Sequence, residues 1–268
     1  MRYLFDHLGT IRDVLARSPL GLATDVDGTI SEIAPLPERA QITPACREQL
    51  AILTSHLALV AAISGRPALV VRDMIGIEGI VYVGNHGLER WQDGALVFEP
   101  GAEVYREKVP ALCAELEALA DVEGIILEDK GISLAIHYRR CPDQEGARRH
   151  ILEAVARAGT AGDFRTIEGK RMVELRPPID ADKGTAVRAL IERYGLRGGI
   201  YLGDDLTDVD AFAAMHAQGP AFKGIAIAVT GGETAAAVEE SADLVCKGVG
   251  DVERFLRWLA ETAPGPGH

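Results

Sequence analysis

The chain has 268 residues, 47% of them hydrophobic, and its 40 acidic against 28 basic side chains give a formal net charge of −12. This acidic balance argues against nucleic acid and anionic membranes as partners, because both attract basic surfaces. The chain contains no run of about 18 apolar residues, so the sequence predicts no membrane-spanning helix. Residues 1–21 do not resemble a signal peptide. Four scattered cysteines without Cys-X-X-Cys spacing argue against a zinc site or a disulfide framework, so we expect a cytoplasmic protein.

Apolar strands alternate with helices in the first third of the chain. Thr43 and Pro44 form a helix N-cap followed by a first-turn proline, and a second helix is expected from Arg66. Uninterrupted apolar strands that alternate with helices are typical of a parallel sheet covered on both faces. The expected strands cover residues 21–26, 59–64 and 79–85.

A different order follows, with helices expected over residues 103–119 and 143–158 and two short strands after each. The first strand pair flanks Lys130-Gly131 and the second flanks Gly169, which indicates two hairpins. This order predicts an α+β unit with an antiparallel sheet. The strand–helix alternation then returns, with helices over 183–194, 208–217, 233–240 and 251–262 and strands in GIYLGDD, GIAIAV and ADLVCK.

The sequence therefore predicts an α/β fold, with a parallel Rossmann-like core sheet and an inserted α+β cap domain. We expect the core in residues 1–103 and 180–268 and the cap in residues 104–179. Ligands of open α/β sheets bind beyond the carboxyl ends of the strands. Four stretches there carry unusual chemistry: Asp25-Val26-Asp27-Gly28-Thr29, Ser64-Gly65-Arg66, Lys183 in DADKGTAV, and Asp204-Asp205-Leu206-Thr207-Asp208.

These residue types suit a metal-assisted phosphoryl site. Two carboxylates beside a core, as at Asp25 and Asp27, are costly when unpaired, and a divalent cation relieves their repulsion. Carboxylate and water oxygens suit Mg²⁺, and Asp204 and Asp208 are further candidate ligands. Lys183 adds a compact positive charge. The Ser64 hydroxyl and backbone amides near Gly28 and Gly65 are candidate donors to phosphate oxygens.

The motifs DVDGT, ISGR, the helix-leading Lys183 and GDDLTD are similar, in order, to the four motifs of haloacid-dehalogenase (HAD) phosphatases. The resemblance implies that Asp25 is a nucleophile that forms an aspartyl phosphate and that Asp27 is the general acid and then the base. Ser64 and Lys183 would stabilise the transferring phosphoryl group.

The same resemblance implies the ligand sets. Mg²⁺ would be held by Asp25 and Asp204, by the Asp27 backbone carbonyl, and by Asp208 either directly or through water. Substrate would be bound in the core by Gly28, Thr29, Gly65, Arg66 and His86. For His86, the alternative is a loop histidine with an ordinary structural role.

The inserted domain resembles that of the trehalose-6-phosphate phosphatase family, on the stretches GNHGLE, EDKGISLAIHYR, GKRMVELRPP and DKGTAV. The family implies Mg²⁺-dependent hydrolysis of trehalose 6-phosphate to trehalose and phosphate, within trehalose biosynthesis. It implies a small sugar phosphate as the partner, and we expect a monomer. The implied sugar-binding residues of the cap are Glu128, Lys130, Arg139, Lys170 and Glu174.

Several alternatives stay open from the residues alone. The charged cap residues also fit the outward face of an antiparallel sheet with cross-strand ion pairs. Another sugar phosphatase on the same scaffold would act on sucrose 6-phosphate, a glycosyl-3-phosphoglycerate or a hexose phosphate. A phosphomutase would return the phosphoryl group to a sugar. A phospho-acceptor receiver would use a similar aspartate, but receivers have about half this length and no cap.

Overall fold

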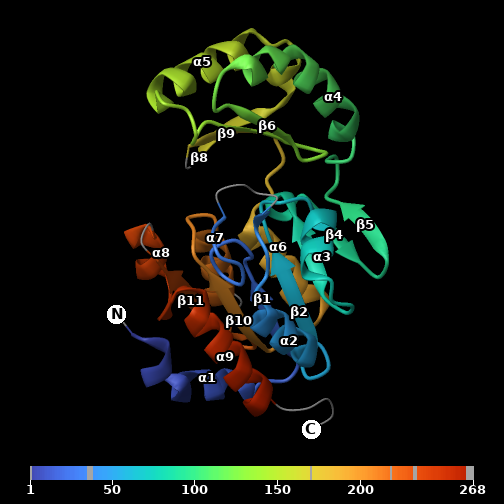
Figure 1. Ribbon diagram of the computed structural model, residues 1–268. Helices are drawn as coiled ribbons and strands as arrows, with labels where there is room; N and C mark the ends of the chain where they lie inside the picture. The colour runs from blue at the N-terminus through green and yellow to red at the C-terminus, as the bar shows by residue number, and fades with distance from the viewer. Residues whose placement is uncertain (1, 35–38, 170, 218, 232–233, 264–268) are drawn as a thin grey trace. The chain divides into compact units, whose positions relative to one another are not determined.

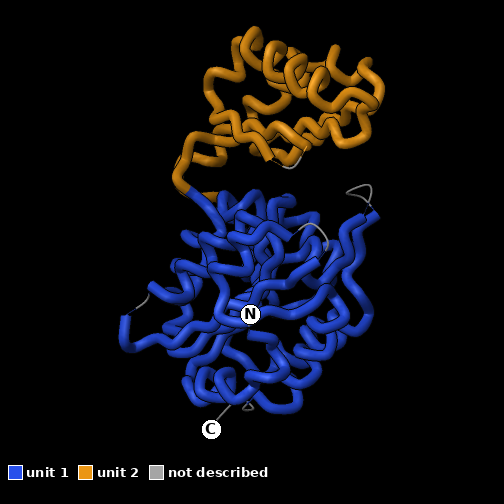
Figure 2. The backbone as a smooth tube through the Cα atoms, turned by 90° about the vertical axis from the view of Figure 1, so that its left-hand side faces the viewer, with its two compact units in different colours: residues 1–97, 181–268 blue, residues 98–180 orange. Residues whose placement is uncertain are grey.

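The computed structural model describes residues 2–34, 39–169, 171–217, 219–231 and 234–263. It divides into two compact units, with residues 1–97 and 181–268 in unit 1 and residues 98–180 in unit 2 (Figure 2). Unit 2 is therefore inserted into the chain of unit 1. Its role as a domain that sets substrate specificity stays a prediction.

An eight-stranded sheet forms the centre of unit 1, in the order β12-β11-β10-β1-β2-β3-β4-β5 (Figure 1). Neighbours from β12 to β3 pair in parallel, and β4 pairs antiparallel to β3. The predicted parallel core sheet is thus confirmed. The strands are β1 (Leu20–Thr24), β2 (Leu59–Ile63), β3 (Val81–Gly84), β4 (Glu89–Gln92), β5 (Ala95–Phe98), β10 (Gly198–Gly203), β11 (Lys223–Thr230) and β12 (Leu244–Lys247).

Helices cover both faces of this sheet, which explains why its central strands are apolar throughout. Alternate side chains of a strand point to opposite faces, so Leu22 and Ala23 of β1 belong to two separate hydrophobic cores. The first core includes residues of α1 (Leu8–Leu15), α2 (Pro44–Leu53), α3 (Ala68–Ile75) and α9 (Gly248–Thr262). The second includes residues of α6 (Lys183–Arg193), α7 (Asp208–His216) and α8 (Ala236–Ser241).

Unit 2 is an antiparallel sheet with helices on one face, in the strand order β6-β7-β9-β8. Leu134, Ile136 and Val173 pack in one core with Leu112 and Ile151 of the two helices. Glu128 and Glu174 flank Ala135 on neighbouring strands and belong to the opposite face. The elements are α4 (Tyr105–Glu115), β6 (Ile126–Asp129), β7 (Leu134–His137), α5 (Gln144–Arg157), β8 (Arg165–Gly169) and β9 (Met172–Arg176).

The sequence pattern missed one hairpin and misplaced some element ends. Strands β4 and β5 were not expected, although Asp93 and Gly94 form the turn between them with φ of 52° and 78°, a combination typical of tight hairpins. The helix expected over 103–119 ends at Glu115 and is followed by a 3₁₀ segment over Glu117–Asp121.

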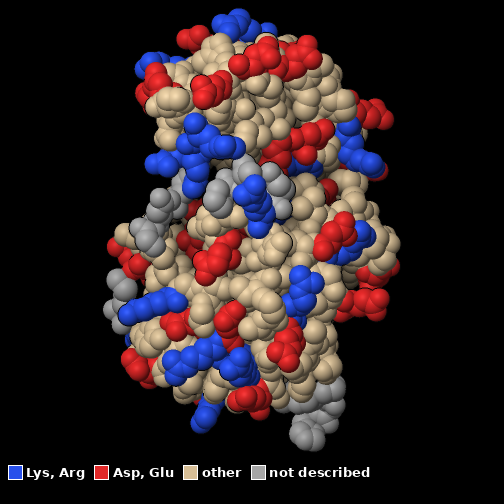
Figure 3. Space-filling view, in the orientation of Figure 1, with Lys and Arg blue, Asp and Glu red and all other residues tan. Residues whose placement is uncertain are grey.

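The surface charge and the helices of the described residues both bear on whether a membrane or a nucleic acid is a partner. Acidic and basic side chains are interspersed on the face in Figure 3, and neither sign covers a whole unit there. Among the described helices, none combines the length and the apolar character needed to cross a bilayer.

The start of α6 is fixed by its cap and by a glycine. The Asp182 carboxylate accepts a hydrogen bond from the Thr185 amide at 2.6 Å, and the Thr185 hydroxyl accepts one from the Asp182 amide at 2.9 Å. This capping box makes Lys183 the first residue of the helix. A Cβ on Gly184 would lie 2.4 Å from the carbonyl oxygen of Asp210 in α7. Glycine therefore permits the close approach of α6 to α7.

We predict that Gly184→Ala destabilises the protein, although alanine is favoured over glycine inside helices. The added methyl overlaps the Asp210 carbonyl, and such overpacking costs about 1–3 kcal/mol. The matched control is Gly250→Ala in the first turn of α9, where a Cβ meets nothing within 4 Å; it should stabilise by up to about 1 kcal/mol. Urea unfolding of both variants measures the two free energies, and a stabilised Gly184→Ala would contradict the packing argument.

Candidate active site

Four loops with polar residues follow the carboxyl ends of neighbouring strands. Asp25 follows β1, Ser64 follows β2, His86 follows β3 and Asp204 follows β10. Strand β1 pairs in parallel with both β2 and β10, and β2 with β3, so these ends lie at one edge of the sheet. The predicted gathering of motifs at this edge is what the topology requires.

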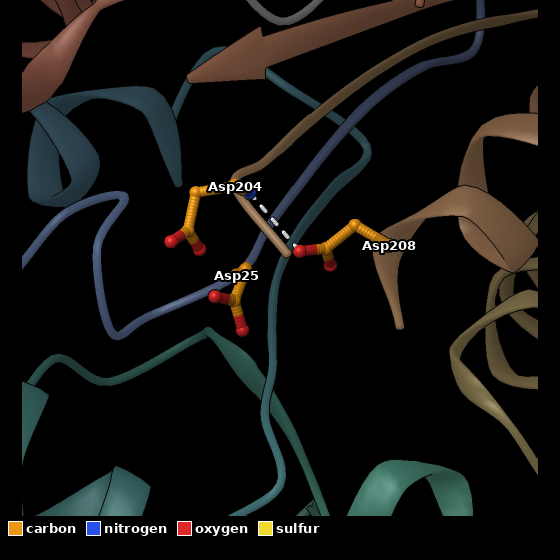
Figure 4. A group of neighbouring side chains, drawn as sticks. All are labelled: Asp25, Asp204 and Asp208. Carbon is orange, nitrogen blue, oxygen red and sulfur yellow. Dashed lines mark hydrogen bonds between the residues drawn. The ribbon is translucent and has the colours of Figure 1, made fainter. Parts of the chain in front are cut away.

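Three carboxylates meet at this edge (Figure 4). Oxygens of Asp25, Asp204 and Asp208 all lie within 4.8 Å of one another, and all three residues lie among the described part of the chain. In the figure the carboxylates of Asp25 and Asp204 lie close together, while that of Asp208 faces the Asp204 backbone. Asp25 and Asp208 are buried. This donor set is of the hard oxygen type that divalent cations such as Mg²⁺ prefer.

Lys183 links two of these carboxylates. Its Nζ lies 2.6 Å from Oδ1 of Asp25 and 2.7 Å from Oδ1 of Asp208, and its side chain is only 3% exposed. Burial alone disfavours the charged ammonium, but the Asp208 and Asp25 carboxylates outweigh burial and raise the pKa of Lys183. The lysine is therefore held as a cation and directed at Asp25.

Asp208 accepts hydrogen bonds at both of its oxygens. Oδ1 accepts from Lys183 and, at 2.7 Å, from the Tyr201 hydroxyl. Oδ2 accepts from the backbone amides of Asp204 and Asp205, both at 3.0 Å. Four donors match the roughly four lone-pair positions of a carboxylate. This arrangement favours an Asp208 that organises its neighbours over one that binds a cation directly, and its contact with the metal stays a prediction.

The remaining negative charge is only partly compensated. Burial is the main factor that raises the pKa of Asp25 well above its ordinary value, and the Asp208 and Asp204 charges raise it further against the effect of Lys183. Burial and the Asp208 charge likewise raise the pKa of Asp204 to about 7. Such shifts are expected where carboxylates outnumber nearby cations. The cluster therefore fits a bound divalent cation.

Asp27 and Arg66 form an ion pair that the sequence did not predict. Arg66 Nε lies 2.6 Å from Asp27 Oδ2, and its Nη2 lies 2.8 Å from Oδ1. This two-point contact is the strong geometry for arginine and carboxylate. The Arg66 amide also donates to the Ser64 hydroxyl at 3.2 Å. Arg66, predicted to bind substrate, thus holds the predicted acid–base residue in this structure.

The small residues of the motifs leave room for their neighbours. Gly28 has φ of +84°, and a Cβ there would lie 2.2 Å from Asp204 Oδ2. The Thr29 hydroxyl donates to Asp204 Oδ1 over a long 3.5 Å. A Cβ on Gly65 would lie 2.4 Å from His86 Nε2, so the His86 ring packs against the loop after β2. Each of these predicted residues therefore contacts another predicted residue.

The predicted residues of unit 2 form two charged groups on the sheet face away from its helices. Lys130 Nζ lies 2.9 Å from Oε1 of Glu174, which is 1% exposed. Glu128 Oε2 lies 2.7 Å from His137 Nε2. Arg139 is exposed in the turn after β7, and Lys170 lies outside the described residues. Their roles in sugar binding stay predictions.

Sequence reasoning did not predict three of the residues that contact the candidate site residues in units 1 and 2. Arg176 donates to Glu174 at 2.6 Å, His137 contacts Glu128, and Tyr201 contacts Asp208. A sequence signal existed for two of them, Arg176 and Tyr201. Arg176 is two residues after Glu174 and shares its strand face. A tyrosine inside an apolar buried strand such as β10 needs a partner for its hydroxyl.

Comparison with known proteins identifies relatives over most of the chain. Residues 23–245 match the family described as Trehalose-phosphatase. A rice protein named "Probable trehalose-phosphate phosphatase 3" is 31% identical over 260 residues, which are 88% of this chain and 68% of the relative. Over other curated relatives the chain spans between 16% and 55% of their length.

Solved structures share the fold at lower identity. The C-terminal domain of C. albicans trehalose-6-phosphate phosphatase superposes with a TM-score of 0.77 at 20% identity, over 97% of this chain and 99% of that one. A haloacid dehalogenase-like hydrolase from Bacteroides thetaiotaomicron gives 0.62 at 17% identity, over 89% and 98% of the two chains. The fold is therefore that of HAD hydrolases, and by its match over residues 23–245 the chain belongs to the trehalose-phosphatase family.

Proposed function

We propose that this protein hydrolyses trehalose 6-phosphate to trehalose and phosphate, as a step of trehalose biosynthesis. The main support is the buried Asp25 carboxylate, held 2.6 Å from the Lys183 ammonium at the carboxyl edge of the core sheet, in a chain of the trehalose-phosphatase family. A cytoplasmic location and a monomeric state stay predictions.

The proposed cofactor is Mg²⁺, held by the carboxylates of Asp25 and Asp204, with the Asp27 backbone carbonyl and Asp208 as further candidates. Burial, together with the charges of the neighbouring carboxylates, raises the pKa values of Asp25 and Asp204, and this cost of ionising both acids supports a cation at this position. When bound, the ion supplies positive charge against the phosphoryl oxygens and the Asp25 carboxylate.

The proposed chemistry uses two carboxylates in turn. An oxygen of Asp25 attacks phosphorus, the bond from phosphorus to the sugar oxygen breaks, and Asp27 donates a proton to that oxygen. Asp27 then accepts a proton from a water molecule, whose oxygen attacks the phosphorus of the aspartyl phosphate. The bond to Asp25 breaks and phosphate leaves. Lys183 and the Ser64 hydroxyl stabilise the negative charge of the transferring group.

The geometry adds a condition to this scheme. Arg66 binds both carboxylate oxygens of Asp27 at 2.6 and 2.8 Å. Both oxygens of this carboxylate are therefore engaged by one guanidinium, in a two-point contact. Both proton transfers proposed for Asp27 therefore require at least one of these hydrogen bonds to open, so that an oxygen of Asp27 can reach the sugar oxygen and later the water molecule.

Unit 2 is the proposed source of sugar specificity. Glu174 is buried between Lys130 and Arg176, and Glu128 contacts His137. Charged groups with fixed orientation are well suited to hydrogen-bond sugar hydroxyls. We infer that Glu128, Lys130 and Glu174 take this role, together with Arg139 and Lys170, as the family resemblance implies.

The first test is phosphate release from trehalose 6-phosphate, sucrose 6-phosphate, glucose 6-phosphate and glucosyl-3-phosphoglycerate, with and without Mg²⁺. We expect a strong, metal-dependent preference for trehalose 6-phosphate. Asp25→Asn, which removes the nucleophile, should lower turnover by about a thousandfold or more. The matched control is Asp73→Asn, which alters an exposed carboxylate on α3 and should leave turnover unchanged.

The outcomes separate the rival functions. A preference for another ester would keep the core chemistry and overturn the substrate. Sugar bisphosphate or an isomeric sugar phosphate among the products would indicate a phosphomutase. Absence of turnover with every ester, in folded protein supplied with Mg²⁺, would overturn the catalytic proposal and favour a binding or receiver role.

A second prediction concerns Glu174. Glu174→Gln should raise KM for trehalose 6-phosphate about tenfold or more, which corresponds to about 1.4 kcal/mol, because a charged sugar contact is lost. Hydrolysis of p-nitrophenyl phosphate, which has no sugar, should be unaffected. The control Glu168→Gln alters an exposed glutamate on β8 that pairs with Arg148. An unchanged KM in folded Glu174→Gln would remove Glu174 from the proposed sugar site.

A third prediction concerns pH and the metal. Without a divalent cation, the pKa of Asp204 is about 7, against its ordinary value of 3.8. The folded state then binds more protons than the unfolded state between about pH 4 and 7, so the free energy of unfolding falls as pH rises through this interval. In a chelator, the melting temperature should be lower at about pH 8 than at about pH 6.

The variant Asp204→Asn isolates this contribution. It should flatten the fall in melting temperature in chelator, because the titrating carboxyl is gone. Mg²⁺ should stabilise the wild-type protein more at the higher pH, where it displaces no proton, and should stabilise Asp204→Asn little. Parallel pH profiles for the wild-type protein and the variant would contradict this interpretation of the cluster.

A further inference from the structure

Tyr201 places a polar group beneath the candidate active site. It lies in β10, where the other residues of the strand are glycine or aliphatic, and it is fully buried. Its ring contacts Phe212 of α7 edge-on, with centroids 5.8 Å apart. Its hydroxyl donates to Oδ1 of Asp208 at 2.7 Å.

The carboxylate that receives this hydrogen bond connects two parts of the site. Asp208 Oδ1 also accepts from Lys183, whose Nζ contacts Asp25. Its Oδ2 accepts from the amides of Asp204 and Asp205. A rotation of the Asp208 carboxylate about its χ2 angle would therefore disturb its contacts with Lys183 and with the Asp204 and Asp205 amides together. A group that fixes this rotation acts on all of them.

We propose that Tyr201 is a positioning residue for phosphoryl transfer, which fixes the Asp208 carboxylate so that Lys183 stays directed at Asp25 and Asp204 stays beside it. The expected effect on kcat rests on the proposed function. The positioning of Asp208 by Tyr201 does not, because it concerns only contacts within this chain. Tyr201 does not touch the reacting atoms in this account and acts through Asp208.

The expected effect follows from the donors that remain. Without the hydroxyl, Oδ1 of Asp208 keeps a single donor, Lys183, whose ammonium is shared with Asp25. Small errors in the placement of catalytic groups reduce the chemical step strongly. Substrate binding, which uses other groups, changes less. The loss should therefore appear in kcat and in the affinity for Mg²⁺ and only weakly in KM.

The test is Tyr201→Phe, with Tyr82→Phe as the matched control. Tyr82 is also a buried strand tyrosine, in β3, and its hydroxyl bonds the backbone of Ile77 instead. Both variants lose one buried hydroxyl. We expect kcat for trehalose 6-phosphate to fall about tenfold or more in Tyr201→Phe, with KM within about twofold, and both constants to be unchanged in Tyr82→Phe.

Mg²⁺ binding measured by calorimetry in the absence of substrate gives a readout independent of activity. The dissociation constant should rise several-fold in Tyr201→Phe and stay unchanged in Tyr82→Phe. If the wild-type protein hydrolyses no ester yet this difference in Mg²⁺ affinity is found, the proposed function fails and the positioning role stands.

Three results would overturn the inference. One is a kcat and an Mg²⁺ affinity in Tyr201→Phe within twofold of the wild-type values. Another is an equal loss in Tyr82→Phe, which would mean that a buried hydroxyl matters only for general stability. The third is loss of the native near-ultraviolet circular dichroism in Tyr201→Phe alone, which would make the hydroxyl a requirement of folding and not of positioning.

Discussion

The buried ammonium of Lys183 is the contact on which the rest of the site depends. It lies between Asp25 and Asp208, at 2.6 and 2.7 Å, and these two residues come from parts of the chain 183 positions apart. A buried carboxylate without a partner is strongly destabilising. Lys183 thus allows the end of β1 and the start of α7 to carry acids beside a hydrophobic core. Its place at the first turn of α6, fixed by the Asp182 cap, is a condition of the whole arrangement.

One lysine cannot neutralise three carboxylates, so the cluster of Asp25, Asp204 and Asp208 keeps an excess of negative charge. Asp25 and Asp204 keep raised pKa values in spite of Lys183. The fold supports this electrostatic strain with apolar cores on both sides of the sheet, and burial of apolar area is the main stabilising contribution in such domains. A structure built only for stability would replace one of the acids. The excess charge is more readily understood as the means by which the site attracts a cation.

Much of the fold and of the core site could be predicted from the sequence, because the signals are local. Apolar strands bounded by Gly and Pro, a cap at Thr43 and acids directly after a strand all lie within a few residues of one another. The partners of side chains do not follow from local patterns. Arg66 with Asp27, His137 with Glu128 and Tyr201 with Asp208 depend on strand order and register, which the chain reveals only when folded. The β4–β5 hairpin was missed because four-residue strands give a weak pattern.

The contact of His86 with Gly65 has a consequence for how such a sequence can change over evolution. The ring of His86 occupies the space that any side chain at position 65 would need. His86 itself adopts a left-handed backbone with φ of 57°, which is uncommon outside glycine, although histidine adopts it more often than most residues. Substitutions at the two positions are therefore coupled. A larger residue at 65 requires the His86 ring to move away or to be replaced, so a substitution at 86 favours a later one at 65.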